Sequence, residues 1–196
     1  MPGRQPQHLV SARGSGRGDV SRHVFVDETK HRGYVLVASV AVSGELEALR
    51  RVVRGLVLPG QRRVHMKDEN DSRKRAIAAA IVGVGVEAVV YDAGRRYRTE
   101  REGRAECLRG LVEDAATAAG HTRLVIEQDD SLVSWDSQRL IELSRAAGCQ
   151  DRLKYEHQRA TAEQLLAIPD AVAWCWGKGG EWRRRIAPAV TAVRKV

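Results

Sequence analysis

Apolar positions recur along this chain with two periods, and each period predicts a different kind of element. Residues 23–28 and 34–42 are short runs rich in β-branched side chains, which is typical of strands. The turn-like TKHRG between them contains Gly33, which tolerates a positive φ, so we expect an antiparallel hairpin. Residues 43–56 repeat apolar side chains at the helical period, which predicts an amphipathic helix that ends before Pro59.

The rest of the chain alternates between helical and extended patterns. We expect strands at 62–66, 86–92, 122–129 and 152–157, and helices at 71–83, 104–120, 134–147 and from the capping box at Thr161 and Gln164 onward. The predicted strands come first and are followed by alternating helices and strands. This order predicts one mixed sheet covered by helices, which is the α/β class. A length of 196 residues suits a single domain.

The positive charge is unevenly distributed along the sequence. The net charge is +8, and residues 1–22 and 177–196 carry +3 and +5 of it, so residues 23–176 balance to zero. We therefore expect a flexible basic arm over 1–22, a folded domain over 23–176 and a basic C-terminal tail over 177–196. Basic ends suit the phosphates of a nucleic acid, and they are equally common as solubilising segments.

Several classes of protein fit this composition poorly. No apolar run approaches the roughly 20 residues of a membrane-spanning helix, and the start of the chain lacks the apolar segment of a secretory signal. Cys107, Cys149 and Cys175 lie far apart, which fits neither a disulfide framework nor a CxxC metal site, so we expect small buried side chains. A cytoplasmic location without a membrane partner follows, and the oligomeric state stays open.

Acidic side chains close two of the predicted strands. Asp27 and Glu28 end the first strand, where alternation places Asp27 on the same face as Phe25; the alternative is a turn residue of the following loop. Glu127 ends the apolar run LVI and is followed by an acidic segment that includes Asp130, which a solvated loop would also explain. Crowded carboxylates repel unless a cation relieves them, and such hard oxygen ligands suit Mg²⁺ or Mn²⁺.

A third acid, Asp170, lies among apolar side chains of the last predicted helix. An acid in that setting needs a partner or a metal to offset its desolvation. Alternatively, Pro169 restarts the helix and Asp170 is a first-turn carboxylate that the helix dipole favours. Spacing alone does not connect the three acidic sites.

Four segments resemble, in order, a large bacterial family known as domain of unknown function 3800. VFVDETKHRGYVLVASVAV is similar to its opening, a strand ending in Asp-Glu-Ser-Gly and then a long apolar strand. HMKDENDSRKR is similar to its strand-to-helix segment, LVIEQDD to its acidic strand end, and LLAIPDAVAW to its closing Leu-Gln-Ile-Ala-Asp-Leu helix. The match spans roughly residues 23–176 and implies a ribonuclease H-like fold, a mixed sheet flanked by helices, with nuclease activity.

Carried across residue by residue, the resemblance implies a set of metal ligands and a catalytic set. The family's acidic positions fall on Asp27, Glu28, Glu127 and Asp170, with Asp130 as an additional candidate ligand. Asp27, Glu127 and Asp170 form the expected catalytic set.

This chain departs from the family pattern at several positions. Thr29 and Lys30 replace the Ser-Gly after the first acid, which places a lysine beside the expected metal site. Pro169 replaces an alanine, and Glu127 stands where aspartate is commoner. These departures leave open whether the site is active.

The leading hypothesis is phosphodiester hydrolysis with two divalent ions, Mg²⁺ or Mn²⁺, held by the carboxylates. The residues expected to bind RNA or DNA are Lys67, Arg73, Lys154 and His157. The second hypothesis is a non-catalytic nucleic-acid-binding module, and the third is a strand-transfer enzyme of the integrase kind, for which no end-recognition segment is evident. The sequence does not distinguish RNA from DNA or internal from terminal cleavage.

Overall fold

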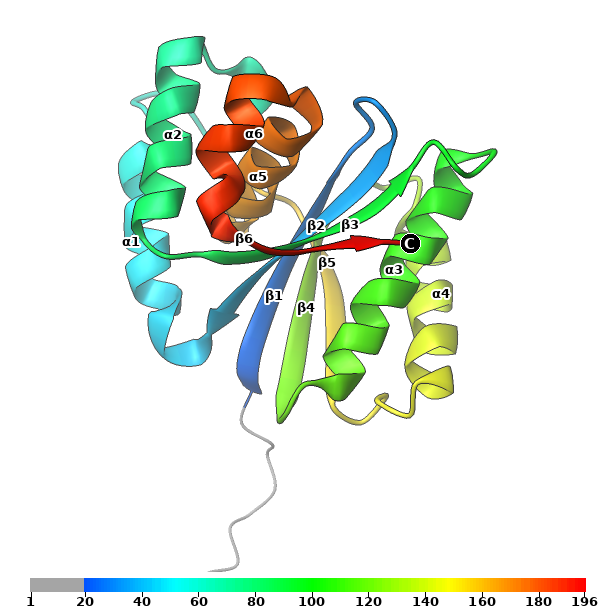
Figure 1. The fold of residues 1–196 in the computed structure, drawn as a ribbon. Coiled ribbons are helices and arrows are strands. Elements are labelled where there is room, and N and C mark those ends of the chain that lie inside the picture. The colour runs from blue at the N-terminus through cyan, green and yellow to red at the C-terminus, as the bar shows by residue number, and fades with distance from the viewer. Residues whose placement is uncertain (1–19) are drawn as a thin grey trace, which may run out of the picture.

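The two strand-forming runs at the start pair with each other in the middle of a six-stranded sheet in the computed structural model, which describes residues 20–196 (Figure 1). β1 (Val20–Thr29) and β2 (Tyr34–Val42) are antiparallel, which confirms the predicted hairpin. Gly33 in their turn has a φ of 128°, and a Cβ there would lie 2.5 Å from the carbonyl oxygen of Gly94. The turn therefore requires glycine for both its φ and its close approach to the neighbouring strand.

The remaining strands extend the sheet on both sides of the hairpin, in the order β5-β4-β1-β2-β3-β6. They are β3 (Glu87–Gly94), β4 (His121–Glu127), β5 (Leu153–Gln158) and β6 (Val190–Lys195). β4 is parallel to β1 and to β5, β3 is antiparallel to β2, and β6 is parallel to β3. The carboxyl ends of β1, β3, β4 and β5 consequently lie at one end of the sheet.

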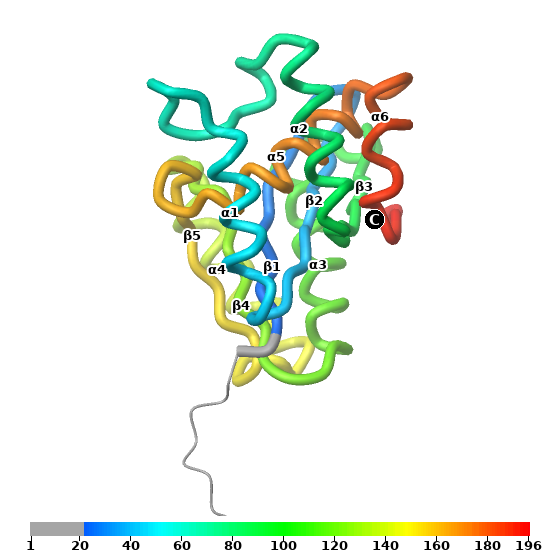
Figure 2. Tube along the Cα trace, turned by 90° about the vertical axis from the view of Figure 1, so that its left-hand side faces the viewer, coloured from blue at the N-terminus to red at the C-terminus, as the bar shows by residue number. Residues whose placement is uncertain are grey.

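Helices cover both faces, as the α/β pattern predicts (Figures 1 and 2). The face seen toward the viewer in Figure 2 carries α1 (Leu46–Leu56), α2 (Asp71–Gly83), α5 (Ala167–Lys178) and α6 (Gly180–Ile186), and the other face carries α3 (Glu100–Thr117) and α4 (Val133–Ala146). None of these helices is long and apolar enough to cross a membrane.

Alternation along β1 divides its side chains between two cores. Phe25 belongs to the core beneath α1, α2 and α5, whereas Val24 and Val26 belong to the core beneath α3 and α4. The same alternation sends Asp27 and Glu28, at the end of the strand, to opposite faces.

The segment 62–66, predicted as a strand, instead belongs to the connection between α1 and α2. Val64 and Met66 are buried and anchor this connection to the core, which accounts for the extended apolar pattern without a strand partner. The last predicted helix also differs, because α5 begins at Ala167 after a short 3-10 turn rather than at Thr161.

Residues 177–196 are not the basic tail that their charge predicted. They form α6 and β6, and the buried side chains of Trp182 and Ile186 fix them to the core. Arg194 of β6 forms an ion pair with Glu113 at 3.0 Å, so part of the charge binds the body of the protein. Residues 1–19 of the predicted N-terminal arm lie outside the described residues, and residues 20–22 belong to β1 rather than to the arm.

A buried ionic network connects the end of β1 to the α3–α4 face. Arg104 is 1% exposed, and its Nε and Nη2 donate to the Asp136 carboxylate at 2.7 and 2.6 Å. Its Nη1 donates to Glu28 at 2.8 Å and to the Tyr34 hydroxyl at 2.7 Å, while Nε2 of His157 lies 3.2 Å from Asp136. Burial alone would raise the pKa of Asp136, but the hydrogen bonds from Arg104 and His157 lower it below its ordinary value. Every charge in the network therefore has a partner.

Removing the Arg104 guanidinium would leave the carboxylates of Asp136 and Glu28 without a positive charge beside them. We expect Arg104→Met to lower the free energy of unfolding by about 3–5 kcal/mol, measured by urea denaturation. The double variant Arg104→Met/Asp136→Leu restores a matched apolar pair and should recover part of that loss. A single variant within about 0.5 kcal/mol of wild type would contradict this account, because that is the usual effect of a surface substitution.

Candidate active site

Three acidic side chains from different elements lie at the carboxyl end of the sheet. Asp27 is close to the end of β1, Glu127 is the last residue of β4, and Asp170 lies in the first turn of α5, which packs across β1. The negative charges of Glu127 and Asp170 both act on Asp27. The fold thus brings together the three acids that spacing alone did not connect.

Burial makes two of these acids hard to ionise. Desolvation raises the pKa of Asp27 well above its ordinary value, and the charges of Glu127, Asp170 and Glu28 raise it further. The backbone N–H of Glu28 donates to Asp27 Oδ1 at 2.7 Å and partly opposes this rise. Burial also raises the pKa of Asp170 to about 6, although the backbone N–H of Met66 donates to its Oδ2 at 2.8 Å. A bound cation would relieve both penalties.

Pro169 determines how Asp170 reaches the site. Because α5 begins at Ala167, Pro169 lies in the first turn, where its missing N–H leaves no helical hydrogen bond unmade. Asp170 is therefore a first-turn carboxylate, as one interpretation of the sequence predicted, and it is also half-buried, with the negative charge of Glu127 acting on it.

The connection between α1 and α2 covers the acids and supplies cations. Nη1 of Arg63 donates to Glu127 Oε1 at 2.5 Å, and Nδ1 of His65 lies 2.8 Å from Oδ2 of Asp68, which orients the ring. Sequence reasoning missed Arg63, because RRVHM resembled a strand; the adjacent arginines were its only signal.

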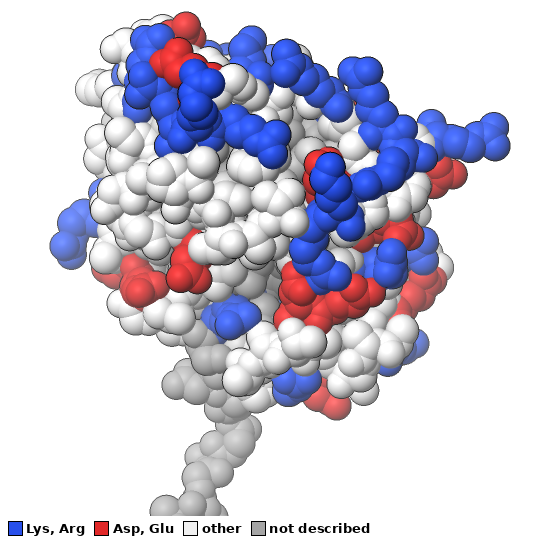
Figure 3. Space-filling view, in the orientation of Figure 1, with Lys and Arg blue, Asp and Glu red and all other residues white. Residues whose placement is uncertain are grey.

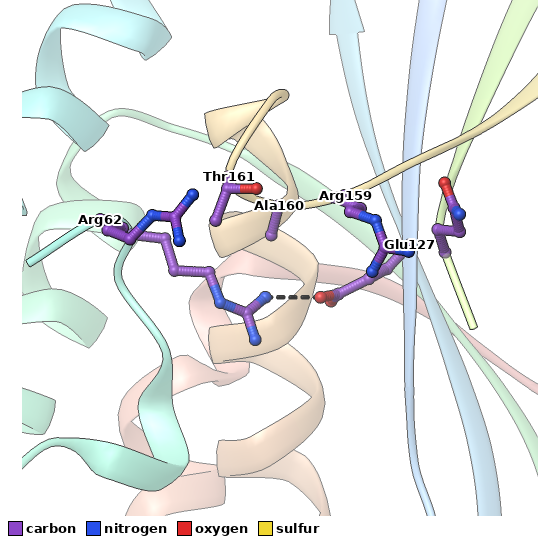
Figure 4. A pocket seen from close by; sticks show the side chains of 7 residues that line it. Arg62, Glu127, Arg159, Ala160 and Thr161 are labelled. Carbon is purple, nitrogen blue, oxygen red and sulfur yellow. Dashed lines mark hydrogen bonds and ion pairs between the residues drawn. The ribbon is translucent and has the colours of Figure 1, made fainter. Parts of the chain in front are cut away.

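Two hollows flank the acids. The first, of about 270 Å³, is lined by Asp27, Glu28, Thr29, Lys30, His65, Lys67, Asp170 and Trp174. The second, of about 390 Å³, is lined by Arg62, Arg63, Glu127, Gln128, Arg159, Ala160 and Thr161. Figure 4 shows Glu127 in the second hollow with the guanidinium groups around it, and its dashed line marks the ion pair with Arg63. One hollow is mixed in charge and the other is mainly basic.

Two of the five expected metal ligands are engaged elsewhere. The Glu28 carboxylate is bound to Arg104 on the opposite face, although the residue borders the first hollow. Asp130 is exposed and pairs with Arg159 at 2.7 Å. The structure therefore groups Asp27, Glu127 and Asp170 without the side chains of Glu28 and Asp130.

The four residues expected to bind nucleic acid are dispersed. Lys67 is exposed and lines the first hollow. Arg73 braces the α1–α2 connection through Glu69 at 3.4 Å and through the carbonyl of Leu56. Lys154 is exposed on β5 and lines neither hollow, and His157 is bound to Asp136 in the buried network.

The three grouped acids fit a hard divalent cation by their chemistry. They offer only oxygen donors, and the raised pKa values of Asp27 and Asp170 show that negative charge there lacks compensation. However, no three His, Cys, Asp or Glu side chains within residues 20–196 are already arranged to hold a metal ion. The Glu127 carboxylate is paired with Arg63, whose positive charge stands where a metal ion would bind that acid.

Comparison with known proteins supports the fold. No protein-family model and no curated protein matches the chain. The chain is similar to the structure of the PCNA:RNase HII complex from Archaeoglobus fulgidus, with a TM-score of 0.54 and 16% identity over 80% of this chain and 72% of that chain. Similarity at this identity shows the fold alone. The chain therefore has the ribonuclease H-like fold that the sequence resemblance implied, and membership of the domain of unknown function 3800 family stays a prediction.

The uncompensated charge of Asp27 has a consequence for stability without metal. Because its pKa is raised in the folded state, the unfolded chain releases this proton first, and stability falls as the pH rises above the ordinary value of 3.8. We expect Asp27→Asn to raise the free energy of unfolding at pH 8 in EDTA by about 1 kcal/mol or more, measured by urea denaturation.

Two comparisons make this prediction specific. The gain should disappear below the ordinary pKa, where the carboxyl is protonated in both states. Asp130→Asn, at an exposed acid, should give no such gain. A loss of stability for Asp27→Asn at pH 8 would show that the carboxylate is compensated after all.

Proposed function

We propose that this chain is a divalent-metal-dependent nuclease that hydrolyses phosphodiester bonds of RNA or DNA. The observation that carries the proposal is the grouping of Asp27, Glu127 and Asp170 at one end of a ribonuclease H-like sheet, with Asp27 and Asp170 half-buried and their pKa values raised. The RNase HII named in the similar structure and the sequence resemblance to the domain of unknown function 3800 family support the same activity.

In this proposal Asp27, Asp170 and Glu127 would hold Mg²⁺ or Mn²⁺. When bound, such ions activate a water molecule and stabilise the negative charge on the leaving oxygen. Nη1 of Arg63 lies 2.5 Å from Oε1 of Glu127, and this ion pair orients the Glu127 carboxylate. If Glu127 held such an ion, the Arg63 guanidinium would be available to bind a phosphate of the substrate.

The other side chains around the first hollow position the substrate. Lys67 is exposed and forms no ion pair with another residue in 20–196, so it is free to bind a phosphate oxygen. His65 faces the same hollow with its ring oriented by Asp68, a place from which it can donate a hydrogen bond to the leaving oxygen. Asp27 and Asp170 act as ligands rather than as nucleophiles.

A non-catalytic nucleic-acid-binding module is the second candidate. It is favoured by the Arg63–Glu127 ion pair, since an arginine that remains there would keep the third acid from a metal ion. Binding that is unaffected by removal of divalent metal, together with no cleavage, would identify this function. Deleting residues 177–196 is unsuited to testing it, because α6 and β6 belong to the fold.

The activity is tested directly with purified protein and a panel of single-stranded, double-stranded and hybrid RNA and DNA. We expect cleavage with Mg²⁺ or Mn²⁺ and none in EDTA. Asp27→Asn and Asp170→Asn should each reduce the rate roughly 100-fold or more, because each removes a negative ligand while keeping its shape.

Asp151→Asn is the matched control and should cleave at nearly the wild-type rate, since Asp151 is exposed, comes just before β5 and lines neither hollow. Absence of cleavage across the whole panel would count against the proposal, as would full activity of Asp27→Asn.

A further inference from the structure

Basic side chains lie on both sides of the grouped acids. On one side, Arg62, Arg63 and Arg159 surround the hollow that contains Glu127. On the other side, Lys30 lines the hollow of Asp27 and also borders two further hollows of about 230 and 190 Å³ next to α3. Lys30 therefore connects the acids to a second basic region.

This second region is built from two connections at the carboxyl end of the sheet. One is the β1–β2 turn, which contributes Lys30, and the other is the β3–α3 connection with the start of α3, which contributes Arg95, Arg98 and Arg101. Figure 3 shows Lys and Arg gathered along the upper edge of the molecule over these connections. We call these four residues the α3-side arm, and Arg62, Arg63 and Arg159 the Glu127-side arm.

Several cations in the arms form no ion pair within residues 20–196, or pair only with an exposed acid. Arg95 and Arg98 are exposed and line the 190 Å³ hollow. Neither they nor Arg62 forms an ion pair with another residue in 20–196. Arg101 lies with its guanidinium carbon 5.6 Å from the ring centroid of Trp135, which orients it without neutralising it. Lys30 pairs only with the exposed Glu100, at 3.1 Å. Their charge is available to an external anion.

The arrangement fits a long polyanion better than a small one. Residues 23–176 have no net charge, so cations concentrated at one end of the sheet are a local feature and not a reflection of overall basicity. A mononucleotide or a free phosphate would occupy one hollow and leave the other arm unused. A nucleic-acid strand carries phosphates at regular intervals and can engage both arms at once.

We propose that the two arms form one track for the phosphate backbone, so that the substrate is a polynucleotide that continues on both sides of the acids. The inference rests on the proposed function and deepens it, because a strand held on both sides of the scissile bond is cut internally and needs no free end.

Binding tests the track without any need for cleavage. The full chain is titrated into fluorescently labelled single-stranded DNA, RNA and hybrid duplex in EDTA at several salt concentrations. For Arg95→Gln/Arg98→Gln we expect weaker binding and a slope of log affinity against log salt that is smaller by about 2, one for each lost phosphate contact. Arg62→Gln, in the other arm, should reduce the slope by about 1.

The control is Arg51→Gln/Arg145→Gln, which removes two exposed arginines from α1 and from the end of α4. It makes the same change in net charge and should leave affinity and slope near wild type. Unfolding curves of all variants verify that they are folded. If Arg95→Gln/Arg98→Gln binds every probe as the wild type does, the track is wrong, and an acidic protein partner then becomes the better explanation of the α3-side arm.

Cleavage of a circular single-stranded DNA in Mn²⁺ separates this inference from the proposed function. Cleavage of the circle supports both. Cleavage of linear strands alone contradicts the track and leaves the nuclease standing. If the wild type cleaves nothing while the arm variants lose affinity as expected, the nuclease proposal fails and the track for a polynucleotide stands.

Discussion

Two neighbouring acids at the end of β1 point to opposite faces of the sheet, and only one of them has a cation. Glu28 is bound to the buried Arg104, whose partners reach α4, β2 and, through Asp136, β5. Asp27, on the other face, forms no ion pair within residues 20–196 and instead lies near Glu127 and Asp170. The ionic network on one face fixes the strand end that presents the uncompensated charge on the other.

The α1–α2 connection supplies the partners of the acids on the Asp27 face of the sheet. It folds over the acids, gives Asp170 a backbone donor at Met66 and neutralises Glu127 through Arg63. These contacts reduce the electrostatic cost of holding three acids close together. They also leave Asp27 as the least compensated of the three, so a divalent cation has the most to gain beside it.

Much of the fold could be predicted from the sequence because its signals are local. The hairpin followed from β-branched runs around Gly33. Strand alternation predicted that Asp27 and Val26 lie on opposite faces of the sheet. The C-terminal segment was misjudged because charge dominates its composition, while two buried side chains, Trp182 and Ile186, decide its structure.

The site was only partly predictable, for a physical reason. The approximate grouping of Asp27, Glu127 and Asp170 came from a resemblance, since no local rule joins residues so far apart in sequence. The role of Arg63 and the engagement of Glu28 by Arg104 depend on tertiary contacts that leave no periodic signal. The α3-side arm was hidden because its charge cancels in the sum over residues 23–176.

A crystal structure of the full chain in Mn²⁺, with the metal located by anomalous scattering, tests the proposed metal site directly. We expect a Mn²⁺ peak within coordination distance of the carboxylates of Asp27 and Asp170, with Glu127 released from Arg63. A structure at saturating Mn²⁺ with no peak beside Asp27, and with the Arg63–Glu127 ion pair intact, would contradict the proposed metal site.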